Sequence, residues 1–276
     1  MLSLSAGVCF LSLSCAFVRP LTTPARFGTR FRLSPLNLPR TRQTSISCAS
    51  KYELGATSSF RPGVQMTQQQ YGKASYWDDR YTKDPEIFDW YQRYSGLKDW
   101  ISQYVRKDDN ILMVGCGNSR LSEDMFEDGF TSLTNIDVSR VVIDQMGARY
   151  RDKPALSWVQ MNVCALDFPD ESFNTVIDKG TLDSVLCGEG STANVAKMCM
   201  EISRVLKPNG VYFICSYGVP DNRLQYLEND DYSWTVTVHT IPKPTISAAA
   251  VPDTRDAESV HYLYVCKKGG TAEEGA

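Results

Sequence analysis

A short apolar run near the middle of the chain ends in a glycine turn. Residues 111–114 (ILMV) lead directly to Gly115 and Gly117, and Leu121 and Met125, four apart, predict a helix after the turn. Glycine permits a positive φ and lets a ligand lie against the backbone. This strand, turn and helix therefore predict a nucleotide-type binding site, and a purely structural turn is the alternative.

A carboxylate stands at the distance that such a site requires. Asp137 lies 22 residues after Gly115, at the end of a second predicted strand, where it could accept hydrogen bonds from both hydroxyls of a ribose. A helix cap is the other role for an aspartate at a strand end, but Ser139 is available for capping. The dinucleotide pattern G-x-G-x-x-G is not met, because its third position is Arg120, which disfavours a pyrophosphate turn and an NAD enzyme.

Strand and helix patterns alternate around these residues. This alternation predicts an α/β fold with a mostly parallel, doubly wound sheet and helices on both faces. Near the end of the chain, two strand patterns follow each other without a helix, which predicts an antiparallel pair at the end of the sheet. The predicted strands are residues 111–114, 133–137, 157–163, 173–178, 211–216, 234–241 and 261–267, and the predicted helices are residues 121–127, 141–150 and 193–206.

An aromatic and charged stretch precedes the first strand. Its apolar residues recur every three or four positions and predict helical structure leading into the domain. These residues are Ile87, Tyr91, Tyr94, Leu97, Ile101 and Val105.

The first fifty residues differ in composition from the rest. They hold six of the 29 basic side chains and none of the 32 acidic ones. An apolar stretch too short to span a membrane ends at Ala16, and an Arg-, Ser- and Pro-rich stretch follows, as in transit peptides. The Ala16-Phe17 junction resembles the cleavage motif of bipartite presequences of algal plastids. We therefore expect a targeting presequence (1–50), a linker (51–70), one domain (71–268) and a short tail (269–276), with plastid localisation; a cytoplasmic protein with an ordinary N-terminus is the alternative.

Charge and metal-ligating residues exclude several kinds of partner. Beyond residue 50 the chain is acidic and has no basic stripe, so we expect no nucleic-acid partner, and no membrane association of the mature form. The nine cysteines include no C-x-x-C pair, and His239 and His261 stand far apart. We expect neither a metal site nor a disulfide framework.

A resemblance to a known family rests on several short segments in fixed order. Residues 178–183 (DKGTLD) look like the D/E-K-G-T-L-D-A element of the methyltransferases that modify lysine on translation elongation factor 1-alpha. Residues 76–81, 88–91, 114–119 and 261–264 match that family too, so the similarity extends from about residue 71 to residue 268. It implies a class I, Rossmann-like fold whose seventh strand runs against the others, with S-adenosylmethionine as the cofactor.

The resemblance also implies a role for individual residues. Gly115 and Gly117 would border the methionine moiety, Asp137 would bind the ribose with Val138 after it, and Asn162 and Val163 would hold the adenine. Family members more often carry aspartate where this chain has Asn162, whose carbonyl oxygen can still accept a hydrogen bond. Trp77, Tyr81 and Trp90 would close over the cofactor, with simple helix packing as the alternative, and Lys179 would border it at the fourth strand.

The implied reaction is methyl transfer to a protein lysine or to an N-terminal amine, with a translation elongation factor as a candidate substrate. Asp178 and Asp183 bracket the turn after the fourth predicted strand and are the candidates for orienting the amine, although Asp183 could equally cap the next helix. Two alternatives remain. A small-molecule methyltransferase is mildly disfavoured because no large apolar lid insertion is present, and a non-catalytic S-adenosylmethionine-binding protein is disfavoured because Gly115 and Asp137 are both retained.

Overall fold

The computed structural model describes residues 70–244 and 259–270. The predicted presequence, nearly all of the predicted linker and most of the predicted tail therefore lie outside the described residues. Within the described part, no helix has the length and apolar character needed to cross a membrane.

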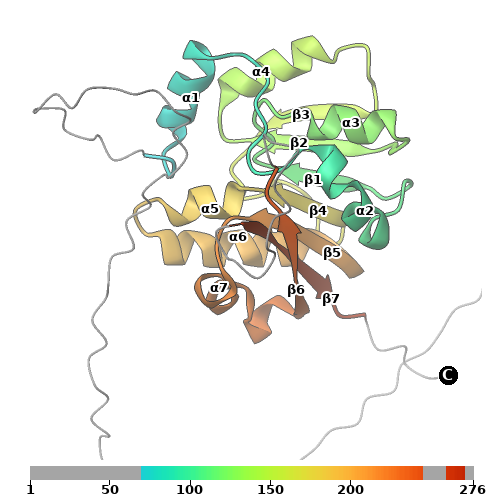
Figure 1. Ribbon diagram of the computed structural model, residues 1–276, viewed down its shortest axis with the longest axis vertical. Helices are drawn as coiled ribbons and strands as arrows, with labels where there is room; N and C mark the ends of the chain where they lie inside the picture. Colours follow the sequence, from blue (N-terminus) through green and yellow to red (C-terminus); the bar gives the residue numbers. More distant parts are fainter. Residues whose placement is uncertain (1–69, 245–258, 271–276) are drawn as a thin grey trace, which may run out of the picture. The chain divides into compact units, whose positions relative to one another are not determined.

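Seven strands form one sheet in the order β3-β2-β1-β4-β5-β7-β6 (Figure 1). Strands β1 to β5 are parallel, whereas β7 is antiparallel to both of its neighbours, β5 and β6. The doubly wound sheet and its reversed last strand, both predicted, are thus confirmed. The strands are β1 (Ile111–Val114), β2 (Leu133–Asp137), β3 (Leu156–Gln160), β4 (Phe173–Lys179), β5 (Leu206–Ser216), β6 (Trp234–Pro242) and β7 (Val260–Lys268).

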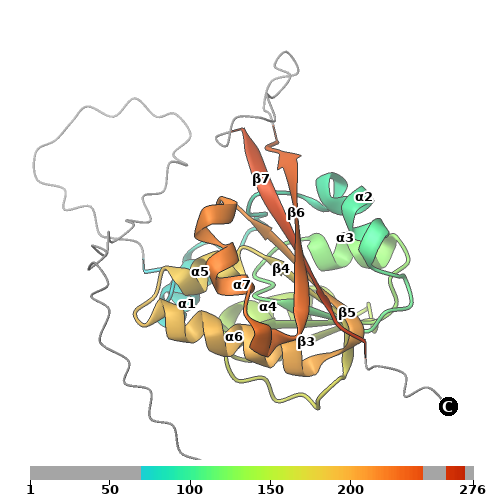
Figure 2. The same ribbon diagram turned by 90° about the horizontal axis from the view of Figure 1, so that it is seen from below.

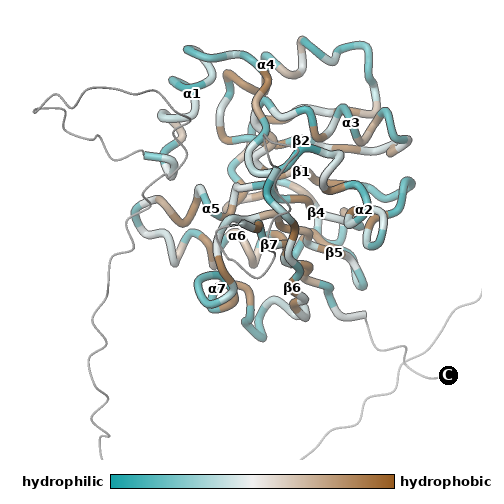
Figure 3. The backbone as a smooth tube through the Cα atoms, in the orientation of Figure 1, coloured by the Kyte–Doolittle hydropathy of each residue, from teal (hydrophilic) through white to brown (hydrophobic). Residues whose placement is uncertain are grey.

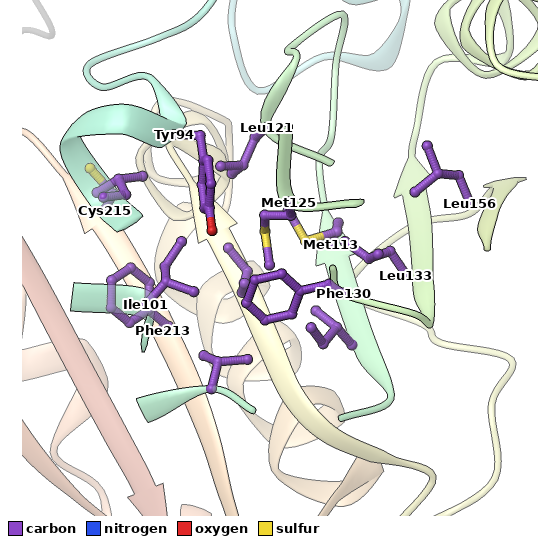
Figure 4. Packing of buried hydrophobic residues seen from close by; sticks show 14 of the residues in the cluster. Tyr94, Ile101, Met113, Leu121, Met125, Phe130, Leu133, Leu156, Phe213 and Cys215 are labelled. Carbon is purple, nitrogen blue, oxygen red and sulfur yellow. The ribbon is translucent and has the colours of Figure 1, made fainter. Parts of the chain in front are cut away.

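Helices cover both faces of the sheet, with α2 and α3 on one side and α5, α6 and α7 on the other (Figures 1 and 2). Each layer buries its apolar side chains in a core of its own. Figure 4 shows the first core, in which Ile101 of α2, Met125 of α3 and Phe213 of β5 pack among one another. The helices are α1 (Ala74–Lys83), α2 (Tyr94–Tyr104), α3 (Leu121–Glu127), α4 (Arg140–Arg149), α5 (Thr181–Leu186), α6 (Ser191–Val205) and α7 (Leu224–Leu227), and two 3-10 turns span Pro220–Asn222 and Asp230–Tyr232.

The hydropathy of the chain follows this layering. In Figure 3 the hydrophobic segments gather in the interior around β5, whereas the connections at the outside are mostly hydrophilic. Burial of the apolar strands is the main favourable contribution to folding, at about 25 cal/mol for each Å² of apolar surface removed from water.

The helix predicted around residues 87–105 is wrong in its first half. Helix α2 begins only at Tyr94, and residues 84–93 have no helical structure. Pro85 explains the break, because it disfavours helical backbone at Asp84, the residue that follows α1. Contacts with the glycine turn then hold the segment, since the Phe88 backbone N–H donates to the Asn118 carbonyl at 3.3 Å.

The third predicted strand is wrong at its end. β3 stops at Gln160, so Asn162 and Val163 lie in the loop that follows. The Asn162 side chain accepts a hydrogen bond from the Cys164 backbone N–H at 2.9 Å. Such a local turn competes with the sheet for backbone groups, which ends the strand.

Candidate active site

The glycine turn lies at the carboxyl end of β1, which pairs with β2 on one side and with β4 on the other. The strand order reverses there, and α/β proteins bind ligands in the crevice at such a switch point. Gly115 has a φ of +58° and Gly117 a φ of +52°. A Cβ on Gly115 would lie 2.0 Å from Thr181 Oγ1, and one on Gly117 would lie 2.7 Å from Tyr81 Oη. Neither position has room for a side chain, so the turn presents bare backbone.

Asp137 ties this turn to the end of β2. Its carboxylate is buried and accepts hydrogen bonds from the backbone N–H of Gly117 and from that of Ser139, each at 2.9 Å. A carboxylate oxygen accepts more than one hydrogen bond, so both oxygens retain capacity for ligand hydroxyls. The capping role falls to Ser139, whose side chain accepts from the Val142 N–H at the start of α4. Asp137 is therefore fixed beside the turn with acceptor capacity left, and it is not needed as a helix cap.

The residues predicted to hold the adenine lie along the same edge of the sheet. Asp137 pairs with Gln160 of β3, and the Gln160 side chain donates to the Val138 carbonyl at 3.1 Å. Val163 is buried, whereas Asn162 is exposed. Val138, Asn162 and Val163 thus follow two neighbouring strands at their carboxyl ends.

Residues 71–93, which we call the cover segment, bring three predicted aromatic residues together. Trp77 stacks on Tyr81 with ring centroids 5.8 Å apart and meets Trp90 edge to face at 6.4 Å. The Tyr81 hydroxyl lies against the space that a Cβ on Gly117 would occupy. The aromatic residues therefore pack on one another and also border the glycine turn.

Lys179 anchors this segment to β4. Its ammonium donates to Asp89 at 3.2 Å and to the Trp90 carbonyl at 3.0 Å. Burial lowers the pKa of Lys179, while the Asp89 carboxylate opposes that shift. The Lys179 and Asp89 side chains are 6% and 10% exposed, and Ser119 also donates to Asp89. The sequence analysis missed Asp89, because a single acid in an aromatic run gives no sign of a partner 90 residues away.

Asp178 performs a structural task at the start of α5. Its carboxylate is fully buried and accepts from the backbone N–H groups of Thr181 and Leu182, at 2.7 and 3.0 Å, and from the Tyr212 hydroxyl at 2.9 Å. Burial raises its pKa to about 7, and these hydrogen bonds partly oppose the rise. It is Asp178, and not Asp183, whose side chain serves the first turn of the helix.

Asp183 lies in the first turn of α5, and its carboxylate contacts the carboxyl end of β5. It accepts from Ser216 Oγ at 2.6 Å and forms an ion pair with Arg223 at 2.8 Å, with both side chains less than a tenth exposed. The part that either aspartate plays at the acceptor stays a prediction. Within the described residues, no group of three or more potential ligands is placed to hold a metal ion.

These features define a class of protein. A bare glycine turn after β1, a carboxylate at the end of β2 and an aromatic segment beside the turn fit the methionine and ribose ends of S-adenosylmethionine. The profile of a family described as a methyltransferase domain matches residues 112–214. The protein is an S-adenosylmethionine-dependent methyltransferase of the class I fold.

More specific relatives narrow this class. The chain is 36% identical over 177 residues to the mouse protein named EEF1A lysine methyltransferase 4, which covers 60% of this chain and 69% of that protein. It is also 36% identical over 154 residues to the human eEF1A lysine and N-terminal methyltransferase, covering 54% of this chain but only 22% of that much longer protein. The chain belongs to the methyltransferase family that includes EEF1A lysine methyltransferase 4.

One solved structure with a similar fold is a chain of the complex between the Haloferax volcanii Trm112 methyltransferase activator and a methyltransferase. Its TM-score is 0.51 and its identity 14%, over 72% of this chain and 97% of that chain. At this identity the likeness concerns the fold.

The environment of Asp137 predicts how cofactor affinity depends on pH. Burial raises the pKa of Asp137 to about 6. With Asp137 as the predicted ribose ligand, ribose hydroxyls would donate to the ionised carboxylate, so binding would favour ionisation and lower this pKa. Affinity should therefore be nearly constant above pH 7 and fall as pH drops through 6, by at most about tenfold per unit. Calorimetry between pH 5 and 8 measures it, with Asp137→Asn as the control that lacks this dependence; an equal dependence in the variant would contradict the assignment.

Proposed function

We propose that this enzyme transfers the methyl group to the amine of a protein lysine. The observation that carries the proposal is the group of side chains beyond Gly180, where the rings of Tyr91 and Tyr217 lie 6.0 Å apart and Asp183 contacts Tyr91 and the Tyr217 backbone. Aromatic faces attract a cationic amine, and the Asp183 carboxylate balances the charge of the nearby Arg223, which would otherwise repel that amine. The names of the relatives support the same acceptor.

Catalysis in this proposal is mainly positioning. Bound S-adenosylmethionine supplies a methyl group on a sulfonium, which transfers to the acceptor nitrogen in a single in-line displacement. Asp137 and the glycine turn hold one reactant, and the acceptor side chains beyond Gly180 hold the other. Alignment of two reactants can supply roughly 7–11 kcal/mol. A free lysine has a pKa near 10.4, so the site must also favour its neutral form, which burial does.

The two aspartates predicted to orient the amine have different places in this proposal. Asp178 holds α5 against β4 through its backbone and Tyr212 hydrogen bonds, and so acts on the site indirectly. Asp183 is nearer to the acceptor, because its carboxylate contacts Tyr91 and the Tyr217 backbone.

A translation elongation factor is the protein substrate that the relatives' names favour, and one group of those names adds an N-terminal amine as a second kind of acceptor. The test is transfer of tritiated methyl groups into a cell lysate, separated into protein and small molecules. Label in protein, mapped to a lysine by mass spectrometry, supports the proposal. Label confined to small molecules would replace it with a metabolite methyltransferase, and label on N-terminal amines alone would correct the acceptor.

The acid-free composition of residues 1–50 supports plastid targeting as a further part of this proposal. In that compartment the substrate would be the plastid's own bacterial-type elongation factor. The test of this localisation is a fusion of residues 1–50 to a fluorescent protein, expressed in an alga whose plastids have extra membranes. Diffuse cytosolic fluorescence would reject it and leave the cytoplasmic alternative.

A further inference from the structure

Tyr91 lies at the centre of the side chains beyond Gly180. Its ring centroid is 5.1 Å from that of His261 in β7 and 6.0 Å from that of Tyr217, which follows β5. A Cβ on Gly180 would lie 3.1 Å from the Tyr91 ring. Gly180 in turn precedes Thr181, the residue that borders Gly115, so Tyr91 stands next to the turn that holds the cofactor.

The backbone of Tyr91 is held in an unfavourable conformation. Its φ is +60°, in the left-handed region that a bulky residue rarely adopts. Such strain costs about 1–3 kcal/mol and persists only where the surroundings impose it, typically at functional sites. Here Trp90 is anchored by Lys179, and the next residue, Gln92, donates to the Pro242 carbonyl at 2.7 Å. Contacts on both sides therefore fix the direction in which Tyr91 points.

The Tyr91 hydroxyl lies close enough to the Asp183 carboxylate to interact with it as a hydrogen-bond donor. Burial and the negative charge of Asp183 raise the pKa of Tyr91 well above its ordinary value, so the hydroxyl keeps its proton. Arg223 donates to Asp183 through Nε at 2.9 Å and balances its charge. Because a carboxylate only accepts, Tyr91 is the donor in this bond, and the lone pairs of its oxygen point away from Asp183.

His261 supplies an independent sign that a ligand binds here. Gln92 Nε2, fixed as a donor by the Pro242 carbonyl, lies 3.2 Å from His261 Nδ1, which therefore accepts, so that Nε2 carries the proton. His261 is 2% exposed, and its Nε2 has no partner among the described residues. A buried donor without an acceptor is costly, and an oxygen of a bound substrate would satisfy it.

We propose that Tyr91 is a catalytic residue whose hydroxyl oxygen accepts a hydrogen bond from the acceptor amine. The proposal rests on the proposed function, because it requires an amine with an N–H to donate. With one N–H held by Tyr91, the nitrogen lone pair is turned toward the methyl carbon. The lone pair forms the N–C bond, the electrons of the broken C–S bond stay on sulfur, and the methylated nitrogen releases its extra proton to water.

The variant Tyr91→Phe tests this role, because it keeps the ring and removes only the oxygen. Tyr94→Phe is the matched control: Tyr94 also donates to an aspartate, Asp128 at 2.6 Å, but does so after the far end of α3. Turnover of labelled methyl into lysate protein should fall about tenfold to a hundredfold in Tyr91→Phe and stay within twofold in Tyr94→Phe. The Kd for S-adenosylmethionine and the melting temperature of Tyr91→Phe should match the wild type.

The outcomes separate this proposal from the one on which it rests. Wild-type label in protein with equal turnover by Tyr91→Phe overturns the role of Tyr91 and leaves lysine methylation standing. A loss of turnover accompanied by an equal loss of cofactor affinity or of melting temperature also overturns it, since the hydroxyl would then serve the fold. If the wild type puts no label into protein, the proposed function fails and the role of Tyr91 fails with it.

Discussion

Asp137→Ala should weaken the binding of S-adenosylmethionine by tenfold or more. The carboxylate is buried and held by two backbone N–H groups, so it is fixed at the end of β2 and still has acceptor capacity left. Each charge-assisted hydrogen bond to a ribose hydroxyl is worth about 1.5–3 kcal/mol, and about 1.4 kcal/mol corresponds to a factor of ten in Kd. Calorimetry on the folded variant measures the Kd for S-adenosylmethionine.

The control for this experiment is Asp108→Ala. Asp108 is an exposed aspartate paired with Arg106, and it precedes β1 at the opposite end from the glycine turn. Its removal should leave the Kd unchanged. An unchanged Kd in Asp137→Ala would remove the ribose assignment, and tighter binding of NAD than of S-adenosylmethionine would contradict the whole site.

Lys179→Met should lower the stability of the protein and also release the cover segment from β4. The change leaves Asp89 buried with a hydroxyl partner but without its cation. Breaking a buried ion pair in this way costs about 3–5 kcal/mol, which for a domain of this size is a fall in Tm of roughly 10 °C. Cofactor affinity should fall too, because Lys179 also holds the backbone at Trp90. Calorimetric melting, with and without cofactor, measures both effects.

Two further variants make this result specific. Arg140→Ala is the control, because it breaks the ion pair between Arg140 and Asp144. These two side chains are 70% and 60% exposed, and such exposed pairs contribute less than about 1 kcal/mol to stability. The double variant Lys179→Met, Asp89→Asn should regain part of the lost stability, since it leaves no unpaired charge. If Lys179→Met melts no lower than Arg140→Ala, the anchor has been misassigned.

The parts of the fold that the sequence predicted best are those in which local pattern and tertiary burial agree. β1, β2 and α3 have the predicted bounds. The central strands are covered on both faces, so their residues form continuous apolar runs that no other element explains as well. Gly115 and Asp137 follow directly from those strands, which is why the sequence could place them together at one edge of the sheet, while their contacts with the cofactor stay a prediction.

The acceptor side could not be predicted in the same way. Ile87 and Tyr91 satisfy a helical period, but their segment is held in a non-helical conformation by hydrogen bonds to backbone groups far away in the sequence. Local spacing carries no information about such bonds. The sequence placed Asp178 and Asp183 near the acceptor. Their partners, Tyr212 and Arg223, lie 34 and 40 residues further along, and only the topology brings them together.

The anchoring of the cover segment also determines when the site can form during synthesis. Asp89 and Lys179 are 90 residues apart, and ribosomes add about 5–20 residues per second. The tryptophans of the segment therefore leave the ribosome roughly 5 to 20 s before the lysine that fixes them. In that interval the tryptophans contact each other and Tyr81, but the ion pair that fixes their segment has not formed. A nascent chain stalled before β4 would hold the glycine turn, Asp137 and the cover segment, yet lack the lysine that anchors the segment.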